Sequence, residues 1–131
     1  MRITADTNVL VRAVVQDDPK QARVAAKALS QATLIAIPLP CLCEFVWVLR
    51  KVYRLGNADI GAAIRALADA EKTVMNRLAV EAGLAALEAG GDFADGAIAY
   101  EGQWLGGETF ISFDKASVSM LTAQGRSARL L

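Results

Sequence analysis

Short apolar runs of strand length alternate with longer, Ala-rich segments of helical length along the whole chain. The Ala-rich segments place apolar residues at helical spacing, and alanine is the best helix former. Strands that alternate with helices form a mainly parallel sheet covered by helices. We therefore expect an α/β fold with helices flanking a sheet of about five strands. The expected strands cover residues 2–5, 33–37, 72–76, 109–113 and 127–131.

The expected helices begin and end at residues with clear local preferences. Asp18 can cap a helix whose first position is Pro19, a position that suits proline. Asn57 is expected to lie near the cap of the helix 59–70. The helix 41–53 places Leu42, Phe45, Val46, Leu49 and Val52 on one apolar face. The remaining helices are expected at residues 8–15, 78–89, 95–105 and 115–124.

Length and charge limit the organisation and the class of the protein. With 131 residues, the chain is expected to be a single domain over residues 1–131. Lys plus Arg equals Asp plus Glu, at 14 each, which excludes a globally basic nucleic-acid binder but not a local binding site. The chain has no histidine. Catalysis that depends on imidazole, and metal sites built on histidine, are therefore excluded.

The cysteines and the apolar stretches indicate a soluble protein of the cytoplasm. Cys41 and Cys43 lie two residues apart and are expected to point to different faces of a helix, as reduced thiols. The opening residues show no signal pattern. The longest charge-free apolar stretch, residues 28–43, is too short to span a membrane and contains two prolines.

Four carboxylates lie near expected strand ends or helix starts. Asp6 follows the first strand and Asp114 follows the strand 109–113, at the sheet edge where ligands bind in α/β folds. Asp95 opens a helix after the Gly90–Gly91 break, and Glu44 lies near the start of the helix 41–53. Each acid taken alone is better explained as a structural residue, such as a turn residue or a helix cap, although Glu44 fits that explanation less well. Together they form a candidate site.

The charge pattern supports a site rather than four separate caps. Residues 78–114 contain seven acids and no Lys or Arg. Glu44 stands alone in an apolar helix, where an unpaired carboxylate would be costly to bury. Carboxylates that converge without cations repel one another, and a divalent cation removes that conflict. An all-oxygen donor set suits Mg²⁺ or Mn²⁺, which can polarise water for attack on a phosphate ester.

Four short blocks carry a resemblance to a known family. Residues 5–10 (ADTNVL) resemble the opening of the PIN domain, in particular that of VapC-type toxins of bacterial toxin–antitoxin pairs. Residues 43–49 (CEFVWVL), 92–99 (DFADGAIA) and 113–115 (FDK) are similar to the second, third and fourth blocks of the family. The blocks occur in family order and span nearly the whole chain.

The resemblance implies a PIN-like three-layer sandwich and a metal-dependent endoribonuclease. The catalytic acids of the family map to Asp6, Glu44, Asp95 and Asp114. Asp6 and Asp95 would bind Mg²⁺ or Mn²⁺ most directly, Asp114 would complete the shell, and Glu44 would act through a bound water. The implied partners are an RNA substrate such as tRNA, a small cognate antitoxin and a second copy of the chain in a homodimer.

Further residues are assigned around these acids. By resemblance, Asn8 and Ser112 line the site. Gly96 stands where the family often has Ala, which we expect to loosen the helix start. Asp92 is interpreted as a turn residue. RNA also requires cations for its phosphates, and the candidates are Arg50, Lys51, Arg54 and Lys115, with Arg126 and Arg129 near the end of the chain.

Two other functions fit some of these features. A receiver or phosphatase domain would also use Mg²⁺ and an acid after the first strand, although residues 6–8 lack the Asp-x-Asp spacing of the phosphatase nucleophile loop. The second alternative is a catalytically silent PIN-like interaction module. Covalent aspartyl phosphate would identify the first alternative, and the absence of Mg²⁺-dependent stabilisation would identify the second.

Overall fold

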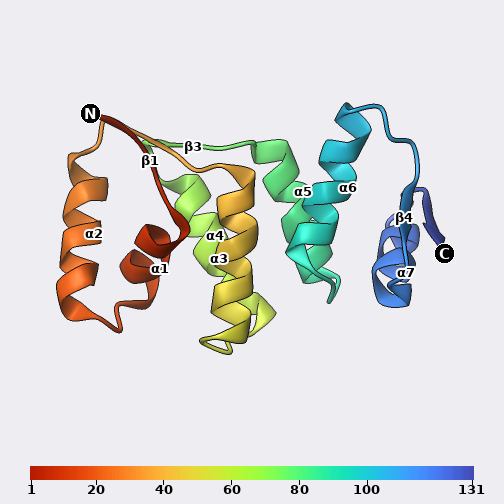
Figure 1. Cartoon of the computed structure of the whole chain (residues 1–131), viewed down its shortest axis with the longest axis horizontal. Helices are drawn as coiled ribbons and strands as arrows, with labels where there is room; N and C mark the ends of the chain where they lie inside the picture. Colours follow the sequence, from red (N-terminus) through yellow and green to blue (C-terminus); the bar gives the residue numbers. More distant parts are fainter. The chain divides into compact units, whose positions relative to one another are not determined.

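The chain forms two compact units, which are described separately below (Figure 1). The computed structural model describes all residues, 1–131. The first unit covers Met1–Asn76 and the second covers Arg77–Leu131.

The first unit contains a small parallel sheet with four helices. The strands are β1 (Arg2–Thr4), β2 (Leu34–Ala36) and β3 (Thr73–Val74), in the order β1-β2-β3. Ile35 in the central strand pairs with Ile3 on one side and Thr73 on the other. Parallel neighbours require crossover connections, and helices provide them here. The helices are α1 (Thr7–Val15), α2 (Pro19–Gln31), α3 (Leu39–Lys51) and α4 (Asn57–Asp69).

The core of the first unit is formed by the apolar faces of these helices against the sheet. In α3, the predicted face is confirmed at Leu42, Phe45, Val46 and Leu49, which are all buried. Val52 was predicted on the same face but is 60% exposed, because α3 ends at Lys51. The other fully buried side chains of this unit are Leu10, Ile37, Ile60 and Ile64.

The second unit contains three helices and a pair of parallel strands. Its elements are α5 (Arg77–Glu88), α6 (Phe93–Trp104), β4 (Phe110–Ser112), α7 (Lys115–Ala123) and β5 (Ala128–Leu130). β4 pairs with β5 in parallel, with Ile111 opposite Arg129, and α7 packs on both strands. The α5–α6 pair provides most of the buried apolar surface, including Leu84, Leu87 and Phe93.

Glycine allows α5 and α6 to approach closely. A Cβ atom at Gly96 would lie 2.3 Å from the carbonyl oxygen of Ala82 and 2.7 Å from the Cβ of Ala86. The expectation that Gly96 loosens the helix start is therefore wrong. Its missing side chain is what permits the close packing of the two helices.

The α/β class and the parallel strand pairing are confirmed. All five expected strands are present, but their hydrogen bonds divide them into a sheet of three and a separate pair. α3 begins two residues before its predicted start because Pro40 fits the first turn of a helix. α4 begins at Asn57 itself, and Gly56 precedes it without a side-chain cap.

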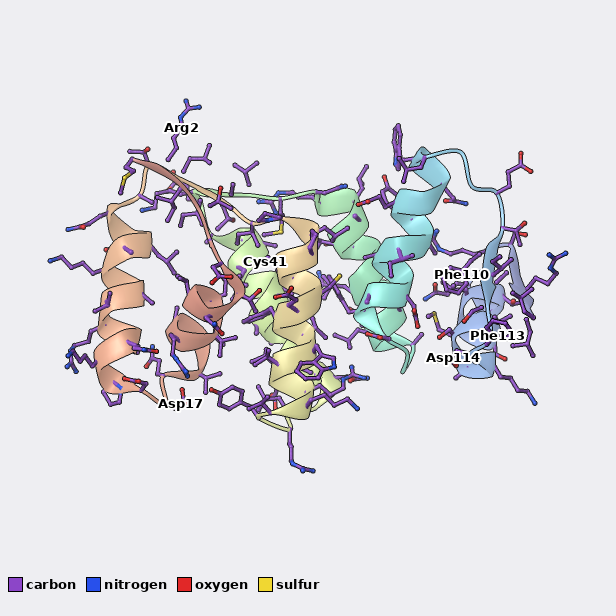
Figure 2. The ribbon with its side chains drawn as sticks, in the orientation of Figure 1. Arg2, Asp17, Cys41, Phe110, Phe113 and Asp114 are labelled. Carbon is purple, nitrogen blue, oxygen red and sulfur yellow. The ribbon has the colours of Figure 1, made fainter.

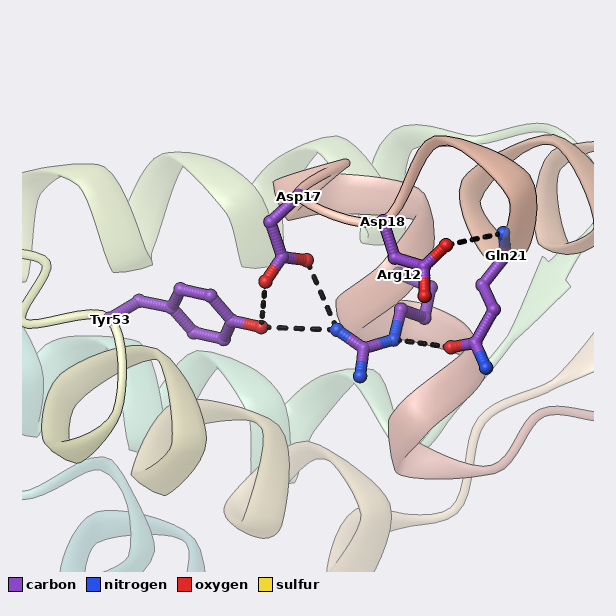
Figure 3. A network of polar contacts seen from close by, with 5 residues as sticks. All are labelled: Arg12, Asp17, Asp18, Gln21 and Tyr53. Atoms are coloured by element: carbon purple, nitrogen blue, oxygen red, sulfur yellow. Dashed lines mark hydrogen bonds and ion pairs between the residues drawn. The ribbon is translucent and has the colours of Figure 1, made fainter.

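A polar network in the first unit holds the α1–α2 turn to the segment after α3 (Figure 3). Arg12 donates from Nη1 to Asp17 Oδ1 at 3.0 Å and to the Tyr53 hydroxyl at 3.2 Å. The Tyr53 hydroxyl donates to Asp17 Oδ2 at 2.8 Å. Arg12 Nε also donates to Gln21 Oε1 at 2.7 Å. The pKa of Asp17 is lowered, first by the hydrogen bond from Tyr53 and further by the Arg12 charge.

Removing the Tyr53 hydroxyl should therefore produce a small, pH-dependent loss of stability. A lowered folded-state pKa stabilises the protein above the unfolded pKa, and that stabilisation is lost as pH falls through the folded pKa. We expect Tyr53→Phe to melt only a few degrees below wild type at neutral pH, because the network is largely exposed. The difference in melting temperature between Tyr53→Phe and wild type should become smaller at acidic pH. Thermal melts at several pH values test this, and a difference that grew in acid would contradict it.

Cys41 and Cys43 are not joined by a disulfide, as predicted. Every helix is too short or too polar to cross a bilayer.

Candidate active site

Asp6 lies two residues after the carboxyl end of β1. Its side chain is exposed and caps α1, accepting a hydrogen bond from the Thr7 backbone N–H to Oδ1 at 2.7 Å. The cap uses one oxygen, and a carboxylate has two. Asp6 therefore retains capacity to bind a further group.

Thr7 connects the start of α1 to the predicted acid of α3. Its buried hydroxyl donates to Glu44 Oε2 at 2.9 Å. Glu44 itself is exposed. The argument from burial in an apolar helix is therefore wrong for Glu44, and the hydrogen bond from Thr7 is what positions this carboxylate. Sequence reasoning missed Thr7, although its position directly after Asp6 was a usable signal.

Cys41 lies in the first turn of α3 (Figure 2), and its sulfur is 3.7 Å from the Thr7 hydroxyl. Its thiol donates to the Ala5 carbonyl at 3.5 Å. Burial is the main cause that raises the pKa of this thiol; the Thr7 hydroxyl opposes the shift, and the charges of Asp6 and Glu44 add to it. Since the thiolate is the form that binds metals, the available donors here are carboxylate oxygens.

Asp95 lies in the first turn of α6, and Asp92 is the N-cap of that helix. Asp92 accepts a hydrogen bond from the Ala94 N–H at 3.2 Å, so it is a helix cap rather than the turn residue predicted. Asp95 is half-buried, and its Oδ2 accepts a hydrogen bond from the Ser117 hydroxyl at 2.6 Å. Burial raises the pKa of Asp95, the Ser117 hydroxyl opposes this, and the charges of Asp92 and Asp114 raise it further.

Asp114 is exposed at the junction of β4 and α7 (Figure 2). It caps α7, with Oδ1 accepting from the N–H groups of Ala116 at 2.9 Å and Ser117 at 3.2 Å. These bonds lower the pKa of Asp114, and the largest cause is the backbone N–H of Ser117. Ser112, predicted to line the site, accepts the Asp114 N–H on its hydroxyl at 2.9 Å. The second unit therefore brings Asp95 and Asp114 together around Ser117.

The remaining predicted residues lie on exposed or partly exposed surfaces. Asn8 is exposed on α1 and lines a groove between α1 and α2. Arg50 donates to Asn57 Oδ1 at 2.8 Å, which links the end of α3 to the start of α4. Among the other predicted RNA-contact residues, Arg126 is partly exposed and donates to Gln103 Oε1 at 3.4 Å. The rest are exposed: Lys51, Arg54, Lys115 and Arg129.

The donor chemistry of these residues fits a hard divalent cation. Within each unit, two acids are joined through one hydroxyl-bearing residue, and neither unit gathers three acids or thiols in one group. The donors are all carboxylate oxygens, which suit Mg²⁺ and Mn²⁺. At Asp95, the charges of Asp92 and Asp114 disfavour a further negative charge. A bound cation would relieve that repulsion.

The comparison with known families agrees with this chemistry. The PIN domain family matches residues 3–117, which is most of the chain. This chain therefore belongs to the PIN domain family, and its fold is that of a nuclease. No curated protein and no solved structure is similar enough to this chain to count as a match.

Proposed function

We propose that this chain is a metal-dependent endoribonuclease and the toxin component of a toxin–antitoxin pair. Membership of the PIN family supports the nuclease activity, and the similarity of residues 5–10 to VapC-type toxins supports the narrower role. The observation that carries the proposal is the pairing of Asp95 with Asp114 around Ser117, within an acidic stretch without basic residues. A bound cation would relieve the repulsion that Asp92 and Asp114 exert on the charged form of Asp95.

We assign a role to each acid. By resemblance to the family, Asp6 and Asp95 would bind Mg²⁺ or Mn²⁺ most directly, Asp114 would complete the donor set, and Glu44 would act through a bound water. When bound, the metal supplies a polarised water nucleophile and stabilises the charge on phosphate oxygens. The helix caps and the Thr7 and Ser117 hydroxyls hold the carboxylates in position before RNA arrives. Such preorganisation lowers the cost of reaching the transition state.

We assign the RNA backbone to the exposed cations at the ends of α3 and α7. Lys51, Arg54 and Lys115 are exposed, whereas the guanidinium of Arg50 is already bonded to Asn57. Phosphate contacts of this kind carry no base specificity and weaken as salt is added. The proposed substrate is RNA, with tRNA as the target class suggested by the resemblance.

The proposed partners also come from the resemblance. They are a small antitoxin that blocks activity and a second copy of the chain. The exposed aromatic side chains Trp47 and Trp104, at 60% and 75% exposure, are of the kind enriched at protein interfaces. We place the protein in the cytoplasm, where its RNA substrate and reduced thiols are both expected.

Purified protein should cut total cellular RNA when Mg²⁺ or Mn²⁺ is present, and the cleavage should stop when EDTA is added. The physical reason is that the chain has no histidine and needs a metal to activate water. Gel analysis of the RNA with each metal and with EDTA is the measurement. Cleavage that continued at full rate in EDTA would contradict metal dependence. Folded protein that neither cuts RNA nor is stabilised by Mg²⁺ would instead be a silent interaction module.

A further inference from the structure

Ser117 occupies an unusual position for a buried serine. It lies in the first turn of α7 and is only 6% exposed. A serine hydroxyl has one proton to donate, and a buried hydroxyl without a partner is costly. Here the proton goes to Asp95 Oδ2 on another helix, α6, at 2.6 Å. The hydroxyl is therefore bonded to one of the proposed metal-binding acids, Asp95, and it also helps to lower the pKa of Asp114.

The local capping arrangement leaves this hydroxyl available. In a capping box, the side chain three positions after the N-cap reaches back to the N-cap N–H. Ser117 has that spacing from Asp114, but the Asp114 N–H is already bonded to Ser112 Oγ. Ser117 contributes its backbone N–H to Asp114 Oδ1 instead. Its side chain is free to cross to Asp95.

One residue thus holds two carboxylates from different helices. Its backbone fixes Asp114 and its hydroxyl fixes Asp95. A lysine or arginine could also hold both acids, but its charge would neutralise them. A serine positions the acids and leaves their negative charge available to a cation.

We propose that Ser117 is a positioning residue of the nuclease centre, which holds Asp95 and Asp114 together for binding of a divalent cation. This inference rests on the proposed function, because it requires those acids to bind metal. Groups that hold metal ligands from behind typically contribute 10–100-fold to metal affinity or activity. The contribution of Ser117 is expected in that range.

The test is a calorimetric titration of Mn²⁺ into wild type, Ser117→Ala, Ser117→Cys and Ser117→Thr. Alanine removes the hydroxyl, and cysteine keeps a similar volume with a weak donor. We expect both to bind Mn²⁺ about 10-fold or more weakly than wild type. Threonine keeps the hydroxyl and should restore most of the affinity. Ser119→Ala, at an exposed position on the same helix, should bind like wild type.

The outcomes separate this inference from the proposed function. Thermal melts in EDTA identify a variant that fails to fold, in which case Ser117→Cys replaces Ser117→Ala. Wild-type affinity in the folded alanine or cysteine variant would overturn the role of Ser117 and leave the proposed nuclease intact. Equal weakening in Ser117→Thr or Ser119→Ala would also overturn it. If wild type binds no Mn²⁺, both the role of Ser117 and the proposed metal-dependent nuclease are overturned.

Discussion

Replacing Asp95 with asparagine should reduce RNA cleavage by at least about 100-fold, which exceeds the usual effect of losing a group behind a metal ligand. Asparagine has nearly the same shape and can still accept the Ser117 hydrogen bond. It lacks the negative charge that a divalent cation requires. The rate of Mn²⁺-dependent RNA cleavage is the measurement, and a variant that cut at the normal rate would exclude Asp95 from the site.

Asp92→Asn is the matched control for this prediction. Asp92 lies three positions earlier and caps α6, and asparagine caps a helix about as well as aspartate. The control should cut RNA at close to the wild-type rate. A large loss in the control would show that the activity depends on the general acidity of this segment rather than on Asp95.

The stability of the Asp95 variant should change in a way that a structural residue would not show. Burial and neighbouring carboxylates raise the pKa of Asp95. A raised pKa means that the folded protein binds the proton more tightly, so stability falls as pH rises through the folded pKa. In EDTA, Asp95→Asn should therefore melt at the wild-type temperature or above it at neutral pH. If Asp95→Asn melted below wild type in EDTA at neutral pH, the claim that neighbouring charges destabilise the charged form of Asp95 would be contradicted.

Replacing Gly96 with alanine should destabilise the fold by about 1–3 kcal/mol, the usual effect of overpacking a core. The new Cβ would lie 2.3 Å from the Ala82 carbonyl oxygen, a backbone atom that cannot move aside alone. α5 and α6 would have to separate, and this pair carries most of the packing of the second unit. Urea-induced unfolding measures the change.

Gly102→Ala is the control for helix propensity. Gly102 lies on the same helix, α6, and a Cβ there would meet no atom within 4 Å. Alanine should raise stability there by up to about 1 kcal/mol, because glycine is a poor helix former. If both variants were equally stabilised, the close contact at Gly96 would be excluded.

Much of the fold could be predicted because strand-length and helix-length patterns differ along the chain. The order of elements, the parallel pairing and the face of α3 from Leu42 to Leu49 followed from periodicity and from turn residues. Gly96 was misread because a contact with Ala82 depends on how two helices pack, which one sequence does not contain. Helix starts also differed, since Pro40 is compatible with both a strand end and a first helical turn.

The candidate acids could be placed at element ends, but their partners could not be predicted. Asp6 and Asp114 follow strands and cap helices, as their positions indicated. The hydroxyls of Thr7 and Ser117 contact Glu44 and Asp95 from other elements, and such tertiary contacts leave no periodic signal. Ser117 has the spacing from Asp114 that a capping box needs, but its side chain bonds to Asp95 instead. The exposure of Glu44 could not be predicted either. Its apolar neighbours in the sequence lie on other faces of α3, so they do not bury it.

The central claim is that Asp95, paired with Asp114 around Ser117, binds the divalent cation that the proposed nuclease needs. Calorimetric titration of Mn²⁺ into wild type, Asp92→Asn and Asp95→Asn tests it most directly. We predict that wild type and Asp92→Asn bind Mn²⁺ with similar affinity and that Asp95→Asn binds it at least about 10-fold more weakly. Wild-type affinity for Mn²⁺ in Asp95→Asn would contradict the claim.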